Sequence, residues 1–295
     1  MRKIALVLTF LLTLTPLAQA VPTGAKSGSG LIRVRKDSKG PVALELATNS
    51  FRNANGTIVD LIGAVHVGER SYYRHLNSDF RQYDAVLYEL IAPTGSGANR
   101  PIPVPGDTSN PLSAMQSGLK NMLGLSFQLD LVDYRAANFV HADISPDEFQ
   151  KSMQDKDESF SKIFLRLMTM SADSSDPQTE KELEKLDLMT LLTKGPTPKD
   201  QLVLRKVLAG TFTNVDALGD ALNGPGGSTL VGVRNQRAIS TLQQQMKKGK
   251  HHLAIYYGVA HMKDMTARLK ALGFQPQGQT WMLAWNLRKI EPVTP

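Results

Sequence analysis

The sequence predicts an α/β fold in which a central mixed β-sheet, with flanking helices, is built from both ends of the chain. Two observations predict it. Short apolar runs typical of strands lie in residues 31–92 and again in residues 251–287, whereas residues 112–223 have almost throughout the character of helix. We therefore assign an α/β core to residues 31–92 and 224–295, and a loop followed by a large α-helical insertion to residues 93–223.

Residues 1–20 have the layout of a cleavable export signal, and residues 21–30 that of a flexible leader. Two basic residues precede an apolar run that a proline ends, and Ala18 and Ala20 give the small-x-small pattern of a cleavage site. The apolar run is shorter than the ~20 residues of a spanning helix, which disfavours an uncleaved anchor. We expect an exported protein, periplasmic or extracellular, with no membrane span after signal cleavage.

The composition is that of an ordinary globular protein, with 41% hydrophobic and 21% charged residues. The formal net charge is +7, but no basic cluster with interleaved aromatic residues occurs, so we expect no nucleic-acid partner. The chain has no cysteine, which excludes disulfides, thiol nucleophiles and thiolate metal ligands. Any metal site must therefore use His, Asp and Glu. The oligomeric state is left open by these observations.

The N-terminal part of the core is expected to contain four strands and one helix. The strands are expected near residues 31–34, 42–47, 57–62 and 85–88. Asn55-Gly56 lies between the second and third strands and is a strong hairpin signal. A surface helix is expected over residues 68–82, before the short buried strand.

The middle of the chain begins with a long loop and continues as helix. Residues 92–111 hold five prolines and three glycines, so they form either a lid or the boundary of an insertion. Ser145 to Glu148 form a capping box with proline at the first helical position, which predicts a helix start. The C-terminal elements expected are a helix over residues 229–248, a strand over 251–257, a helix over 262–272 and a strand over 281–287.

Two segments repeat one design, an apolar strand that runs into Gly-x-x-His and is followed by a helix. One copy carries Gly63 and His66, and the other carries Gly258 and His261. We interpret each glycine as a structural turn that lets the chain leave the sheet sharply. The carboxyl ends of strands are where α/β proteins bind ligands. A further apolar strand ends in Glu89 in the same way, so two imidazoles and a carboxylate are expected close together.

Two histidines and a glutamate are a known ligand set for hydrolytic zinc, with one position left for water. We therefore expect a divalent metal ion, zinc, manganese or cobalt, at His66, His261 and Glu89. Glu89 serves either as third ligand or as general base, and the residues leave both roles open. A single Gly-x-x-His more often marks a structural histidine at a helix start. The second copy and the strand-end glutamate favour the functional interpretation.

These motifs resemble the signatures of the TraB/PrgY/GumN family, which includes the Tiki proteins and is similar more distantly to ChaN and erythromycin-esterase-like proteins. The segments that carry the resemblance are Gly63–Gly68, Ser71–Tyr73, Tyr83–Glu89, Arg234–Ile239 and Gly258–Met262. The resemblance covers about residues 40–92 and 228–288. It implies a metal-dependent, peptidase-like site with the two Gly-x-x-His motifs, Glu89 and Arg234. Many relatives have a glutamate before the arginine, where this chain has Val233.

Arg234 lies near the start of an expected helix and is placed to stabilise an oxyanion or a substrate carboxylate. The alternative is a surface salt bridge. His141 and Asp143 form a His-x-Asp pair that supplies further ligands, or Asp143 orients a histidine; alternatively Asp143 and Ser145 only cap the next helix. Tyr134 is a weaker candidate for a hydrogen bond to substrate.

The function expected from these residues is an exported metal-dependent hydrolase that acts on a peptide or protein substrate. The first alternative is a metal-independent hydrolase of esters or lactones, in which Glu89 and a histidine activate water. The second alternative is not an enzyme but binds and sequesters a metal, a cofactor or a signalling peptide. No Gly-x-Ser-x-Gly motif occurs, which argues against a serine hydrolase.

Overall fold

The computed structural model describes most of the predicted core and part of the predicted insertion. The described residues are 30–93, 95, 99–103, 120–158, 186, 191, 194–212 and 228–291. The predicted export signal, its leader as far as residue 29, much of the proline-rich loop and the middle of the predicted helical insertion lie outside them. In the described part of the chain, no helix is long and apolar enough to cross a membrane.

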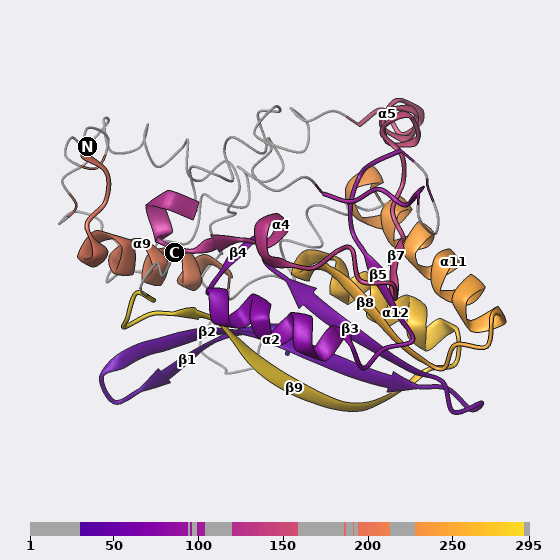
Figure 1. Ribbon diagram of the computed structural model, residues 1–295, viewed down its shortest axis with the longest axis horizontal. Helices are drawn as coiled ribbons and strands as arrows, with labels where there is room; N and C mark the ends of the chain where they lie inside the picture. The colour runs from indigo at the N-terminus through magenta and orange to yellow at the C-terminus, as the bar shows by residue number, and fades with distance from the viewer. Residues whose placement is uncertain are drawn as a thin grey trace.

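A mixed sheet of seven described strands forms the centre of the structure, which confirms the α/β prediction (Figure 1). Its strands are β1 (Ile32–Asp37), β2 (Gly40–Arg52), β3 (Ile58–Ala64), β5 (Ala85–Tyr88), β7 (Phe139–His141), β8 (His252–Gly258) and β9 (Gln275–Asn286). Two short strands, β4 (Val67–Gly68) and β6 (Ser126–Phe127), pair separately.

The long strand β2 joins the two ends of the chain. Strand β9 pairs antiparallel along one edge of β2, while β1 and β3 share the other edge. The predicted hairpin between β2 and β3 is confirmed. Gly56 has a φ of +84°, and the Asn53 side chain accepts hydrogen bonds from the backbone N–H groups of Asn55 and Thr57.

Strands β3, β8, β5 and β7 lie side by side in this order and all run parallel. Their carboxyl ends are in register, because Ala64 pairs with Gly258 and Tyr88 lies between Tyr256 and His141. Residues that follow these four strands must therefore emerge at one edge of the sheet. Strand β7 lies within the predicted insertion, at residues expected to be a loop, because three strand residues are too few to show an alternating pattern.

Helices cover both faces of the parallel strands (Figure 1). Successive strand residues point to opposite faces. Tyr256 packs against Phe80 of α2 (Arg70–Phe80), with 4.9 Å between ring centroids. Tyr257 points to the other face, where α11 (Arg234–Lys247) and α12 (Met262–Ala271) lie. The remaining described helices are α4 (Gln128–Leu131), α5 (Pro146–Asp155) and α9 (Pro198–Thr211).

The helix starts differ in how well the sequence predicts them. The capping box at α5 is confirmed, with Ser145 accepting from the Glu148 N–H and the Glu148 carboxylate accepting from the Ser145 N–H. The helix expected from residue 229 instead begins with a π-helical turn over Thr229–Val233, and α11 starts at Arg234. Strand β9 begins at Gln275 rather than at residue 281, because its first half is a polar and exposed strand without alternation.

A buried ion pair fastens α9 to the sheet region. Arg205 is fully buried and donates to Glu69 Oε1 at 2.6 Å, where Glu69 is 2% exposed. The same guanidinium donates to the carbonyl oxygens of Leu123, Gly124 and Asn286. These bonds attach the described part of the insertion to the last residues of β9, and nothing in the pattern of the sequence predicts them.

Candidate functional site

The edge at which the four parallel strands end brings most of the predicted site residues together. His66 follows β3 by two residues, Glu89 follows β5 directly, and His261 follows β8 by three. Asp143 follows β7 by two residues. Arg234, the first residue of α11, reaches the same edge from the helix layer and completes a group that we call the strand-end cluster.

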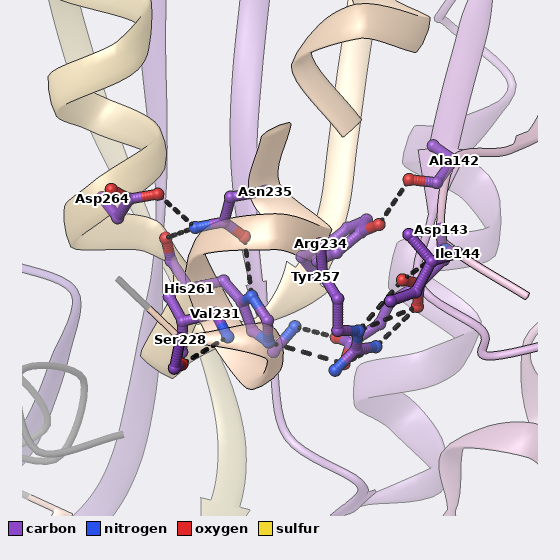
Figure 2. A network of polar contacts seen from close by, with 12 residues as sticks. Ala142, Asp143, Ile144, Ser228, Val231, Arg234, Asn235, Tyr257, His261 and Asp264 are labelled. Carbon is purple, nitrogen blue, oxygen red and sulfur yellow. Dashed lines mark hydrogen bonds and ion pairs between the residues drawn. The ribbon is translucent and has the colours of Figure 1, made fainter. Parts of the chain in front are cut away.

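Arg234 lies at the centre of the strand-end cluster (Figure 2). Its Nε donates to both oxygens of Asp143, at 2.9 and 3.2 Å, and its Nη2 donates to Asp143 Oδ2 at 2.5 Å. Nη2 also donates to Glu89 Oε1 at 2.7 Å. Arg234 is only 7% exposed, so it is not the surface salt bridge considered as an alternative. Burial alone would lower its pKa, but the carboxylates of Glu89 and Asp143 raise it above the ordinary value.

Glu89 is held from three sides. Its Oε1 contacts Arg234 and lies 3.6 Å from His261 Nε2, while its Oε2 accepts from the Gly258 N–H at 2.6 Å. Burial alone would raise the pKa of Glu89, but the charge of Arg234, the neighbouring His261 and His66 rings and the Gly258 N–H outweigh it. The pKa lies well below its ordinary value, so the carboxylate stays ionised throughout the neutral range.

Asn235 determines which nitrogen of His261 carries the proton. Asn235 Nδ2 donates to the His261 carbonyl oxygen at 3.1 Å and to Asp264 Oδ2 at 2.8 Å, so the amide oxygen must face His261 Nδ1, at 2.7 Å. Nδ1 therefore carries the hydrogen, and Nε2 presents its lone pair toward Glu89. Burial lowers the pKa of His261, which keeps the imidazole neutral near pH 7.

His66 differs from His261 although both follow a Gly-x-x-His motif. His261 is 6% exposed and lies in a single 3-10 turn before α12, whereas His66 is exposed and precedes the short strand β4. The pKa of His66 is also lowered, with the surrounding protein as the largest cause. The exposed His66 ring is less desolvated than the ring of His261. The His66 ring makes no hydrogen bond with a described residue, so both nitrogens are available to water or a ligand.

Part of this donor set has the chemistry that a metal ion requires. His261 Nε2 and Glu89 Oε1 are 3.6 Å apart, close to the ~3.4 Å that separates two ligands bound tetrahedrally to one ion at ~2.1 Å. The hydrogen bond from His261 Nδ1 to Asn235 is the kind of support that metal-binding histidines have. Among the described residues, no three His, Asp or Glu side chains are grouped as a complete metal site.

The other predicted candidates have different surroundings. His141 Nε2 lies 2.6 Å from the Leu90 carbonyl oxygen, and its ring packs on Tyr88, so its described contacts are outside the strand-end cluster. Tyr134 is buried, and its hydroxyl accepts from Gln128 Nε2 at 2.7 Å. Asp143, in contrast, is bound to Arg234 and also accepts from the Ile144 N–H.

The two motif glycines lie where neighbouring side chains come close to the backbone. Neither Gly63 nor Gly258 has a positive φ, so the chain can leave the sheet at these positions without the left-handed conformation that favours glycine. A Cβ at Gly258 would lie 3.3 Å from Glu89 Oε2 and 3.6 Å from the His261 ring. A Cβ at Gly63 would lie 3.3 Å from Val259. A Cβ would therefore crowd a site carboxylate at Gly258 and the Val259 side chain at Gly63.

Comparison of the chain with protein-family models, with curated proteins and with solved structures gives no match. The resemblance to the TraB/PrgY/GumN signatures therefore stays a prediction from the motifs. The interpretation of the strand-end cluster depends on the geometry and electrostatics of its own residues.

Proposed function

We propose that the protein is a hydrolase whose reaction centre is the strand-end cluster. The observation that carries this proposal is the convergence of a neutral histidine, an ionised glutamate and a buried arginine at the carboxyl ends of parallel strands. Each of these groups has a protonation state set by its neighbours. Sites of acid–base and electrostatic catalysis require such control.

In the leading form of the proposal, His261 Nε2 and Glu89 would hold a divalent metal ion, and His66 would supply the third ligand. The ion would lower the pKa of a bound water and so supply a nucleophile near neutral pH. Asn235 holds the His261 ring with Nε2 directed toward Glu89. Asp143 is too firmly bound to Arg234 to be a ready ligand, so we assign it the task of positioning Arg234.

Glu89 acts in this proposal as a ligand and charged partner rather than as the general base. A base must accept a proton near neutral pH, which requires a pKa close to the working pH. Arg234, His261 and His66 all act to lower the pKa of Glu89. The choice between ligand and base is therefore made by the charges around the carboxylate.

Arg234 supplies positive charge for an oxyanion that forms on the substrate. Its Nε and Nη2 are bound to carboxylates, whereas its Nη1 has no hydrogen bond with a described residue. A guanidinium held in this way keeps one amino group for a developing negative charge and needs no rearrangement during the reaction. The resemblance to peptidase-like relatives leads us to propose a peptide or protein substrate.

A specific observation also favours a metal-independent hydrolase. Both Glu89 oxygens are already engaged, one by Arg234 and one by the Gly258 N–H. In this second form His261 Nε2 takes a proton from water, Asn235 keeps the ring oriented, and Glu89 at 3.6 Å stabilises the imidazolium that results. Ester and lactone substrates fit this form.

The experiment combines metal analysis with hydrolysis assays on the purified protein. A peptide library and a panel of esters and lactones are tested with and without chelator, for the wild type and for His261→Ala. Bound metal with chelator-sensitive peptide cleavage supports the first form. Chelator-insensitive ester hydrolysis that His261→Ala abolishes supports the second. A folded wild type that hydrolyses none of these substrates, or a His261→Ala variant as active as wild type, contradicts the proposal and favours a binding protein.

A further inference from the structure

A polar groove lies on the outer face of α11, away from the strand-end cluster. It has a volume of about 400 Å³, within the range of small-ligand sites. Its walls come from the C-terminal end of α5, the π-helical turn before α11, the first turns of α11 and the last turn of α12. The lining residues are Ile144, Lys156, Gly232, Val233, Gln236, Arg237, Ser240 and Arg268.

The groove is chemically suited to an anion. Its two arginines each pair with one carboxylate, Arg237 with Glu148 and Arg268 with Asp264. Both ion pairs are partly exposed, with Arg237 at 34% and Arg268 at 27%. Partly exposed pairs are weak, about 0–1 kcal/mol, so an incoming anion can share these cations.

Hydrogen-bond donors remain for such a ligand. A guanidinium has five N–H donors in a planar fork. Arg268 donates through Nε to Asp264, through Nη1 to Gln236 and through Nη2 to the Gly232 carbonyl oxygen. Arg237 donates through Nη2 to Glu148. The unused N–H groups of both arginines suit the oxygens of a carboxylate or phosphate.

A chain of hydrogen bonds connects this groove to the strand-end cluster. Arg268 Nε donates to Asp264 Oδ2 at 2.6 Å, and the same oxygen accepts from Asn235 Nδ2 at 2.8 Å. Asn235 Oδ1 in turn accepts from His261 Nδ1 at 2.7 Å. An anion that draws Arg268 away from Asp264 removes one of the hydrogen bonds that hold the Asp264 carboxylate. Because this carboxylate holds the Asn235 amide in place, the hydrogen bond that sets the His261 tautomer changes as well.

We propose that the groove over α11 binds a small organic anion through Arg237 and Arg268, and that binding is transmitted to His261 through Asp264 and Asn235. The shared chemistry is a carboxylate or a phosphate oxygen. This site is distinct from the reaction centre, since none of its lining residues belongs to the strand-end cluster. It makes the state of the cluster responsive to an anionic effector.

The binding test uses the full protein, with succinate and inorganic phosphate as separate probes in calorimetric titrations. We expect saturable binding of at least one probe, weakened about tenfold by Arg237→Gln, since one charge-assisted hydrogen bond is lost. The matched control is Lys270→Gln, which removes a charge from α12 beside a different pocket and should leave affinity unchanged. Absence of saturable binding, or equal weakening by both variants, overturns the site.

The coupling test follows the isotope-labelled imidazole nitrogens of His261 by NMR during the same titrations. In the wild type their resonances should shift with the saturation curve of the probe. In Asp264→Ala the probe should still bind, which also reports that the variant is folded, but the His261 shift should be lost. A wild type that binds the probe without a His261 shift overturns the coupling. No readout uses catalysis, so these outcomes stand apart from the hydrolase test.

Discussion

At the scale of single residues, Asn235 is the clearest case of a function that sequence patterns miss. The sequence places it beside Arg234 in a motif, but gives no sign that its amide would reach a histidine 26 positions further on. An asparagine side chain can donate and accept hydrogen bonds at the same time. This one side chain therefore binds the His261 carbonyl oxygen, Asp264 and His261 Nδ1 together. Such side-chain networks depend on tertiary placement, which local sequence does not encode.

Replacing Asn235 should therefore reduce activity more than it perturbs the fold. In Asn235→Ala the His261 ring loses the acceptor that fixes its tautomer, and we expect kcat/KM to fall about 10- to 100-fold. The matched control is Gln244→Ala, an exposed position on the same helix. Hydrolysis assays with both variants, alongside thermal unfolding, check this; equal activity in the two variants would show that Asn235 does not position His261.

The lowered pKa of His261 predicts how stability depends on pH. Burial is the largest cause of that shift. The unfolded chain takes up the proton near pH 6.5, whereas the folded protein takes it up at lower pH, so the unfolded state binds more protons as the pH falls below about 6.5. The free energy of unfolding should then decrease by up to about 1.4 kcal/mol per pH unit.

Urea unfolding between about pH 7.5 and pH 5.5 measures this dependence. We expect His261→Gln to have a shallower loss of stability on acidification than the wild type. The control is Gln244→Ala, an exposed position on α11 that carries no titratable group, so the substitution should leave the dependence unchanged. Parallel curves for wild type and His261→Gln would refute the assignment of a buried, neutral imidazole.

At the scale of elements, the strand ends are built to bring side chains against backbone. Gly258 ends β8 and its N–H binds Glu89, so space at this position is part of the site. The sequence predicts β3, β5 and β8 well, since each is a compact apolar run ended by a turn. It misses β7, which has only three residues, and the first half of β9, whose polar residues form an exposed strand.

The variant Gly258→Ala tests the close approach at this strand end. Its Cβ would lie 3.3 Å from Glu89 Oε2, which forces the carboxylate to move by a few tenths of an ångström. We expect kcat/KM to fall by up to about 100-fold with less than about 1 kcal/mol of lost stability. Gly278→Ala is the control, because a Cβ there meets no atom within 4 Å. Wild-type activity in Gly258→Ala would show that the site does not need the space that glycine leaves beside Glu89.

The attachment of α9 gives a prediction about stability rather than activity. Removing Arg205 leaves Glu69 buried without its partner and frees four backbone carbonyl oxygens, so Arg205→Ala should cost about 3–5 kcal/mol. Arg237→Ala breaks the exposed pair with Glu148 and should cost less than about 1 kcal/mol. Chemical denaturation of both variants measures the contrast, and equal costs would contradict it.

At the scale of the whole molecule, the sheet unites residues that lie far apart in the chain. Glu89 and Gly258 are 169 positions apart, yet parallel strands β5 and β8 place them within hydrogen-bond distance. The repeated Gly-x-x-His design predicts this edge of the sheet as the site. It does not predict that His261 is buried and held by an amide while His66 is exposed, because the two motifs have the same residue pattern. That asymmetry arises from α11, which covers His261.

The central claim, that the strand-end cluster is a hydrolytic centre, is tested most directly by one comparison of kcat/KM on a single cleaved substrate. Glu89→Gln keeps an acceptor for the Gly258 N–H but removes the charge that faces His261, so we expect activity to fall at least about 100-fold. Glu148→Gln removes a charge outside the cluster and should retain wild-type activity. A folded Glu89→Gln variant that hydrolyses the substrate as fast as Glu148→Gln would contradict the claim.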